Sequence, residues 1–404
     1  MKIRQNQFDA VIVGAGMGGM TAASLLANDG YKVLILEASH VPGGCSSSYY
    51  RKGYTFESGA TTLIGFDKHQ PLRMLEDTLG ISIKKKPIDP SMQVHMNGKT
   101  ITRYRDKEQW LNEAIRVFGE PSAQQRFWAK AFDVSDTVWK VSGSNHFFPP
   151  LQTKDWFSLL KNNPIDALIL PTAATSVRSM AVQCGITHPD FFRFLDEQLL
   201  ISAQSKADDT PFLFGAPSIT YTNYTNYYVP GGLVEMIRQL QKFVEDRGGS
   251  LHVKEKVLGM SRNEDDTFTL HTSKKRSYRT NLVISNLPVW NMEEITSGPV
   301  RDYFRTESEK YTRAWGAFTM GVVTDDTYDE SMPLHHQLHS SGNEFDGAID
   351  SGSVFVSMSA KGDTERAPDG KRVLNISAHT ETDFWFNLNG NYEETKKSTE
   401  DHVI

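Results

Sequence analysis

The sequence predicts an α/β fold, and three observations along its 404 residues predict it. A short apolar run close to the start ends in three spaced glycines and leads into a helical pattern. A long middle stretch, from residue 106 to about residue 205, has a mainly helical signal. The remainder after residue 290 is rich in short β-branched runs bounded by turn residues, which are typical of strands.

The first element is a strand that runs into a glycine-rich turn. Residues 8–13 are largely apolar without polar alternation, which suits a buried strand of a parallel sheet. The first glycine permits the tight turn, the second lets a pyrophosphate approach the backbone, and the third lets the next helix pack closely. That helix, expected over residues 17–28, directs free N–H groups at the phosphates. The pattern predicts a Rossmann-like dinucleotide site at Gly14, Ala15, Gly16, Met17, Gly18 and Gly19.

An acidic residue follows the second expected strand, residues 32–36. Glu37 lies at its carboxyl end, 23 residues after Gly14, where an acid binds the ribose hydroxyls, and we assign Ala38 to the same site. The carboxylate argues against NADP, because it would repel the additional phosphate. A glycine-rich turn in an unrelated fold is the alternative, but strand, helix, second strand and acid occur here in the required order.

A second glycine pair, Gly43 and Gly44, stands just before Ser46. A simple NAD dehydrogenase does not need such a pair. A flavin enzyme does, because its extended cofactor passes a second backbone segment, and close approach favours glycine. These residues therefore predict FAD as the cofactor, with an ordinary surface turn as the alternative.

Composition and charge exclude several classes of protein. The net charge of −6 gives no electrostatic argument for nucleic acid. Cys45 and Cys184 lie far apart in sequence, which predicts neither a disulfide framework nor a zinc site and fits a reducing compartment. A strand that begins at residue 8 leaves no room for a signal peptide, so we expect a cytoplasmic protein. No apolar stretch approaches bilayer length, so any membrane contact would be peripheral.

The middle of the chain begins with a hairpin and continues as helices. Residues 93–104 are expected to form two strands around Asn97-Gly98, and Asp106 is expected to cap the next helix. The aromatic-rich segment 146–170 has two interpretations. If exposed, it suits the headgroup region of a membrane; otherwise it is an aromatic-rich helical core.

Three strands are expected to return to the nucleotide-binding sheet, at residues 251–257, 267–271 and 282–286. Val257 would lie where backbone groups meet the adenine, with a plain core valine as the alternative, and Asn286 ends the third strand beside the cofactor. Further strands are expected at 316–323, 354–357 and 373–378. His335 and His339 are four residues apart, but their surroundings predict extended chain and no further ligands, so we expect no metal site.

The chain resembles the FAD-dependent carotenoid desaturase and isomerase family (phytoene desaturase, carotenoid isomerase, retinol saturase), within the amine-oxidase-like flavoproteins. The resemblance covers nearly the whole chain. It is carried by five places, namely Val13–Gly19 with Glu37, Pro42–Gly44 with Ser46, Gly53–Gly59, Tyr228–Gly232, and Asp363 with Ala367–Gly370.

Two departures from that family stand out. Glu57 stands where the family usually has aspartate, which is a mild change. The family also has a C-terminal stretch of about a hundred residues that returns to the first domain, adds a last strand and supplies a glycine-rich segment beside the flavin. Nothing after Gly370 has that glycine pattern, so we expect a chain that lacks this part.

The resemblance and the patterns together imply three domains. Residues 1–90 and 228–290 are expected to form the FAD-binding domain, and residues 91–105 and 291–404 a β-rich substrate domain with a mixed sheet. Residues 106–227 are expected to form a helical subdomain that faces the substrate or a membrane.

The function implied is hydride transfer between the flavin and an apolar polyene, as a desaturase, saturase or isomerase. No acid–base constellation stands out, which fits a division of labour in which the cofactor carries the chemistry. A flavin amine oxidase is the alternative enzyme, and it would use an aromatic pair for which Tyr224, Tyr227 and Tyr228 are candidates. A non-catalytic flavoprotein fragment is the alternative of another class.

Overall fold

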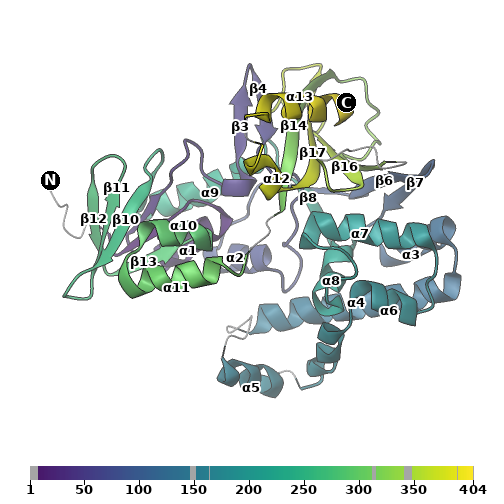
Figure 1. Ribbon diagram of the computed structural model, residues 1–404, viewed down its shortest axis with the longest axis horizontal. Helices are drawn as coiled ribbons and strands as arrows, with labels where there is room; N and C mark the ends of the chain where they lie inside the picture. Colours follow the sequence, from purple (N-terminus) through teal and green to yellow (C-terminus); the bar gives the residue numbers. More distant parts are fainter. Residues whose placement is uncertain are drawn as a thin grey trace.

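The computed structural model describes residues 8–145, 152–162, 164–311, 315–340, 348–388 and 390–403. Three units lie side by side in Figure 1. A nucleotide-binding α/β unit contains the N-terminus, a larger sheet lies beside it, and a layer of helices lies below that sheet.

The α/β unit is built on a parallel sheet of four strands in the order β13-β1-β2-β9. The apolar residues of β1 alternate between its two faces. Ile12 packs with helices α1 and α9 on one face, and Val11 and Val13 pack with a three-stranded antiparallel sheet on the other. The elements of this unit are β1 (Ala10–Val13), α1 (Met17–Asn28), β2 (Val33–Leu36), α2 (Pro71–Leu79), α9 (Val234–Glu245), β9 (Ser250–His252), β10 (Val257–Arg262), β11 (Phe268–Thr272), β12 (Ser277–Thr280) and β13 (Leu282–Ser285).

Three expectations about this unit are wrong in detail. The strand expected at 251–257 is divided, because residues 250–252 form β9 of the parallel sheet and Val257 begins β10 of the antiparallel sheet. The strand expected at 267–271 does not join the parallel sheet, because it pairs with β10 and β12 in the antiparallel sheet. The domain boundary expected at residue 291 falls inside helix α10 (Val289–Ile295). Met292 and Ile295 of α10 and Phe304 of α11 (Gly298–Ser308) pack with the nucleotide-binding sheet, so these helices belong to the first unit.

The second unit is a mixed sheet of six strands in the order β14-β17-β16-β15-β6-β7, in which only the β15–β6 pair is parallel among the described pairings. The expected hairpin is confirmed, with Asn97 at φ 49° and Gly98 at φ 71° between β6 and β7. The strands are β6 (Met92–Met96), β7 (Lys99–Arg103), β14 (Trp315–Asp325), β15 (His335–His339), β16 (Ser353–Met358) and β17 (Lys371–Glu381).

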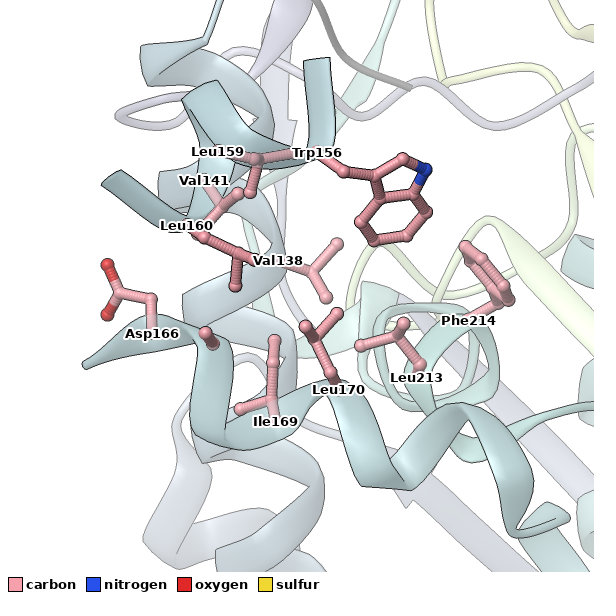
Figure 2. Close-up of a pocket in the computed structure, with 11 residues that line it drawn as sticks. Val138, Val141, Trp156, Leu159, Leu160, Asp166, Ile169, Leu170, Leu213 and Phe214 are labelled. Atoms are coloured by element: carbon pink, nitrogen blue, oxygen red, sulfur yellow. The ribbon is translucent and has the colours of Figure 1, made fainter. Parts of the chain in front are cut away.

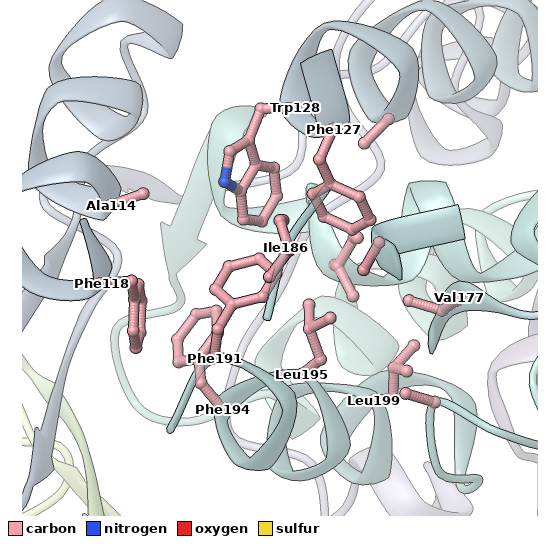
Figure 3. Close-up of a cluster of buried hydrophobic side chains, with 14 of the residues drawn as sticks. Ala114, Phe118, Phe127, Trp128, Val177, Ile186, Phe191, Phe194, Leu195 and Leu199 are labelled. Atoms are coloured by element: carbon pink, nitrogen blue, oxygen red, sulfur yellow. The ribbon is translucent and has the colours of Figure 1, made fainter. Parts of the chain in front are cut away.

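The third unit is helical, as expected. Asp106 caps its first helix by accepting a hydrogen bond from Gln109 N at 2.8 Å. Figure 3 shows the aromatic core, in which Trp128 and Phe127 meet Phe191 with rings set edge to face. The elements are α3 (Lys107–Phe118), α4 (Pro121–Ser144), α5 (Thr153–Asn162), η2 (Asp166–Ala174), α6 (Val177–Gln183), α7 (Pro189–Ala203), α8 (Phe212–Ile219) and η3 (Tyr221–Asn223).

Short elements connect the units. Residues 48–57 form a hairpin, with turn residues Lys52 at φ 51° and Gly53 at φ 92°. This hairpin packs against β17 through Phe56 and Val373. The connecting elements are η1 (Gly44–Ser46), β3 (Ser48–Arg51), β4 (Tyr54–Glu57), β5 (Lys86–Ile88), β8 (Asn226–Tyr228), α12 (Thr382–Phe386) and α13 (Tyr392–Val403).

Candidate cofactor site

The two glycine-rich turns lie against each other at the carboxyl edge of the parallel sheet. Gly43 N donates to Ala15 O at 2.8 Å, and Gly16 and Gly43 form a parallel bridge. A Cβ atom on Gly44 would lie 3.4 Å from the Cα atom of Gly16. Because Gly14 (φ 96°) and Gly43 (φ 119°) have left-handed backbone conformations, side chains are disfavoured here for conformational as well as steric reasons.

The start of helix α1 is open to a ligand. Gly16 is its N-cap, and among the described residues no side chain caps the helix. Gly18 and Gly44 are exposed, Met17 is half-buried, and Ser46 follows in the turn η1. Uncapped N–H groups at a helix N-terminus attract phosphate, and glycine leaves room for it. This cradle fits the pyrophosphate of a dinucleotide.

Glu37 is held at the end of β2 with its carboxylate turned towards the first glycine turn. One carboxylate oxygen accepts from Ala15 N at 2.7 Å and the other from Ser39 N at 2.8 Å. A carboxylate has about four lone-pair sites, so acceptor capacity remains for ribose hydroxyls. Ala38, directly after it, is exposed.

Residues 254 and 255 lie beside Glu37. Glu255 N donates to Glu37 O, and Lys254 N donates to Ser39 O, both at 2.8 Å. Val257 therefore begins β10 close to the ribose end of the site, while its own side chain is buried in the core between the two sheets. The core explains the side chain, and the contact of its backbone with an adenine stays a prediction.

Asn286 lies over the first glycine turn. Its N–H donates to Val13 O at 2.8 Å, which continues the pairing of β13 with β1. Its amide group lies against one side of the turn, since Cβ atoms on Gly16 and Gly18 would lie 2.7 and 2.6 Å from its Nδ2 and Oδ1 atoms. The thirteen residues assigned from the sequence are thus close together, and their roles in binding remain predictions.

A buried ionic cluster behind the second glycine turn was not foreseen. The Glu57 carboxylate accepts from Ser48 Oγ at 2.6 Å and Leu233 N at 3.1 Å, and it lies 3.4 Å from Arg366 Nη1. Arg366 also donates to Asn375 Oδ1 at 2.9 Å. Burial raises the pKa of Glu57 above its ordinary 4.5, and the nearby Arg366 guanidinium opposes this. The sequence signal that could have indicated this cluster was the charged Arg366 within the segment 363–370, which carries the family resemblance.

A second contact ties the same segments together. Tyr228 Oη donates to Asp363 Oδ2 at 2.5 Å, and Gly231 N donates to the same oxygen at 3.0 Å. Burial, the largest cause, raises the pKa of Tyr228, so its phenol stays protonated and can donate. Together with the Glu57 cluster, this contact brings segments 53–59, 228–232 and 363–370 into one support beneath the second glycine turn.

The three candidate tyrosines contact different parts of the protein. Tyr224 donates to Asp136 at 2.7 Å, the Tyr227 ring packs edge-on against Phe66 at 5.3 Å, and Tyr228 makes the contact just described. No two of them stack on each other among the described ring contacts. Each of the three is therefore held by a different neighbour, and a role for two of them as an aromatic pair stays a prediction.

The structure also locates the histidines and cysteines that stood out in the sequence. His335 and His339 lie on strand β15, and no cluster of three or more metal-ligating side chains occurs among the described residues. Cys45 is exposed and Cys184 is buried, and neither forms a disulfide.

The fold and this site define a flavoprotein of the oxidoreductase class. Residues 17–388 match the family model described as flavin containing amine oxidoreductase, and the chain belongs to that family. Its cofactor is FAD, and the glycine cradle, Glu37 and the uncapped helix fit it.

Sequence relatives include carotenoid-acting proteins, which confirms the resemblance. The chloroplastic prolycopene isomerase of Daucus carota is 22% identical over 99% of this chain and 66% of its own length. A neurosporene-forming phytoene desaturase of Cereibacter sphaeroides is 24% identical over 84% of this chain and 65% of its own length. The chain thus spans about two thirds of the length of these curated relatives.

Solved structures confirm the fold class. A Pyrococcus furiosus protein has a TM-score of 0.64 at 16% identity, over 98% of this chain and 83% of its own. Putrescine oxidase bound to putrescine has a TM-score of 0.61 at 14% identity, over 98% and 80%. At this identity the likeness concerns the fold alone.

Proposed function

We propose that the chain forms the FAD-binding and substrate-binding part of an oxidoreductase that acts on an apolar polyene. FAD, when bound, supplies the chemistry of hydride acceptance or donation. The observation that carries the proposal is the convergence of segments 53–59, 228–232 and 363–370, three of the places that carry the resemblance to the carotenoid family. They meet through Glu57, Arg366, Tyr228 and Asp363 at the second glycine turn. The names of the relatives support a polyene as the substrate class.

Pigment analysis tests this function. The chain, with whatever coding sequence adjoins it in its gene, is expressed in cells that make a colourless or cis-configured polyene. We expect an altered pigment spectrum and a purified protein with a flavin absorbance band. A colourless protein without flavin would support the non-catalytic alternative, whereas peroxide release with amines and unchanged pigments would support an amine oxidase.

We further propose that the helical unit contacts a membrane surface through segment 152–170. Phe157, Ile165 and Leu168 are 71%, 79% and 78% exposed, which a core segment would not be. Residues 146–151 and residue 163 lie outside the described part of the segment. No helix in the described ranges is both long and apolar enough to cross a bilayer, so the contact proposed is peripheral.

An apolar cavity of about 180 Å³ lies directly behind this exposed surface. Figure 2 shows side chains from α4, α5, η2 and α8 converging on it, among them Val138, Leu160, Ile169 and Leu213. Asp166, which also lines it, is paired with Lys140 at 2.9 Å. An apolar cavity beneath an apolar surface suits a molecule that arrives from a lipid phase.

Substituting Phe157→Asp together with Leu168→Asp should reduce binding to anionic liposomes more than tenfold, since each apolar side chain contributes about 1.5–3 kcal/mol when fully buried. Both side chains are exposed, so stability should change little. Leu258→Asp is the matched control, because Leu258 is 55% exposed on β10 of the nucleotide-binding unit. Cosedimentation with liposomes measures the effect, and equal binding by all three proteins would contradict the proposal.

A further inference from the structure

The face of the six-stranded sheet turned towards helix α7 is polar, although the proposed substrate is apolar. His335 and Gln337 of β15 lie opposite Ser357 and Phe355 of β16, on one face of the sheet. Gln198 of α7 donates to Gln337 Oε1 at 2.6 Å. Gln337 is therefore satisfied within the protein, since its Nε2 atom also donates to Ser353 Oγ at 2.9 Å.

His335 is one of three residues here with an unpaired polar atom among the described residues, the others being His339 and Gln198, and it is the one that lies nearest to the glycine turns through its hydrogen bonds. Its side chain is 2% exposed and stacks on Phe355, with ring centroids 5.8 Å apart. Its Nδ1 atom lies 2.8 Å from Ser357 Oγ, but its Nε2 atom has no hydrogen-bond partner among the described residues. Buried polar atoms are satisfied in the large majority of cases, so an unpaired one indicates a missing partner.

The hydrogen-bond chain determines what that partner must be. Ser357 Oγ donates to Thr61 Oγ1 at 2.8 Å, which uses its single proton. Ser357 can then only accept from His335, so the proton of the imidazole is on Nδ1. Burial lowers the pKa of His335 to about 3, so the ring is neutral. The Nε2 atom therefore presents a lone pair and requires a hydrogen-bond donor.

The same chain places His335 near the cofactor. Thr61 follows Gly59 and Ala60, and Ala60 N donates to Cys45 O at 2.9 Å, beside the second glycine turn. A Cβ atom on Gly59 would lie 3.0 Å from that same carbonyl oxygen. His335 is thus linked through Ser357 and Thr61 to the segment that lies on the turn assigned to FAD.

We propose that His335 Nε2 accepts a hydrogen bond from a hydroxyl group of the substrate, so that this site prefers a polyene alcohol to the corresponding hydrocarbon. The inference rests on the proposed function and deepens it, because it names the end group that the apolar substrate has. A cation such as an ammonium group would also donate, but the low pKa of the ring shows surroundings that oppose positive charge.

A pair of probes tests the inference on the unmodified full chain. The probes are all-trans-retinol and the hydrocarbon in which its hydroxyl is replaced by hydrogen, titrated by quenching of protein fluorescence. We expect retinol to bind about tenfold more tightly, which is the value of one satisfied buried hydrogen bond. Equal affinities for the two probes would overturn the inference, because an ordered water would then be the partner of Nε2.

Variants locate the effect. His335→Phe should reduce the affinity for retinol about tenfold and leave that for the hydrocarbon unchanged or higher, removing the preference. His336→Phe is the matched control, because its side chain points to the other face and pairs with His95 at 3.1 Å. Flavin content and the thermal midpoint report on folding. If His335→Phe keeps the preference, the assignment is wrong.

The outcomes also separate this inference from the function on which it rests. Failure of both probes to bind a flavin-containing protein would remove the polyene function itself. Binding of both with equal strength would leave that function in place and remove only the role of His335.

Discussion

Substituting Gly19→Ala should abolish the yellow colour of the purified protein. The added Cβ atom would overlap the carbonyl oxygen of Gly14 and would lie 3.2 Å from the Cβ atom of Asn286. Both obstacles lie in backbone or in a residue fixed by strand pairing, so the glycine turn must open. We expect flavin content to fall at least tenfold and the free energy of unfolding to fall by about 1–3 kcal/mol.

Gly259→Ala is the matched control for this substitution. No atom lies within 4 Å of the position where its Cβ atom would be, and its φ is not in the left-handed region. Its flavin content should equal that of the wild type, and its stability should change by less than about 1 kcal/mol. Absorbance at the flavin band per mole of protein and urea unfolding measure both effects. A yellow Gly19→Ala protein of normal stability would contradict the assigned role of the turn.

Substituting Arg366→Met should cost about 3–5 kcal/mol of unfolding free energy, because it leaves the Glu57 carboxylate buried without its cation. Both partners are 4% exposed. The same change removes the hydrogen bonds of Arg366 to Asn375 and to the Thr55 carbonyl oxygen. The exposed pair of Arg305 with Asp302 provides the control, and Arg305→Met there should cost less than about 1 kcal/mol.

The loss of unfolding free energy in Arg366→Met should depend on pH in a defined direction. Burial already raises the pKa of Glu57, and removing the Arg366 charge that opposes this raises the pKa further. A carboxyl group with a raised folded pKa contributes stability that is present below its ordinary value of 4.5 and is lost as pH rises through the folded pKa. The deficit of Arg366→Met should therefore be larger at pH 8 than at pH 5.

A double substitution separates charge from shape. Glu57→Gln combined with Arg366→Met removes both charges, so it should be more stable than Arg366→Met alone and should lose the added pH dependence. Urea unfolding at the two pH values measures each protein. If the deficit of Arg366→Met is the same at both pH values, the Glu57 carboxylate is not the group that the arginine stabilises.

Local patterns in the sequence were sufficient for the parts of the fold that depend on local physics. The hairpin at Asn97-Gly98 and the cap at Asp106 were predicted because turn and cap preferences act over a few residues. The cofactor residues were placed together because strand, glycine turn and acid occur in a fixed order within forty residues. FAD followed from the second glycine pair.

Features that depend on distant contacts were not predictable. An amphipathic pattern shows that α10 and α11 have an apolar face but not which sheet that face covers, so the boundary at residue 291 was wrong. The cluster around Glu57 joins residues from four segments, and no single window contains its partners. The free nitrogen of His335 becomes visible only when Ser357 and Thr61 are brought beside it.

The contact between Glu57 and Asn375 also has a consequence for synthesis on the ribosome. The two residues are separated by 318 positions, so a ribosome that adds 5–20 residues per second needs roughly 15–65 s to produce the second after the first. The first glycine turn gains its last partners when β13 and Asn286 have been made, whereas the support of the second turn cannot form before the far strand arrives. In a cell, the half-made chain therefore presents the Glu57 carboxylate without its Arg366 cation, and an unfinished flavin site, to chaperones and proteases for much of its translation.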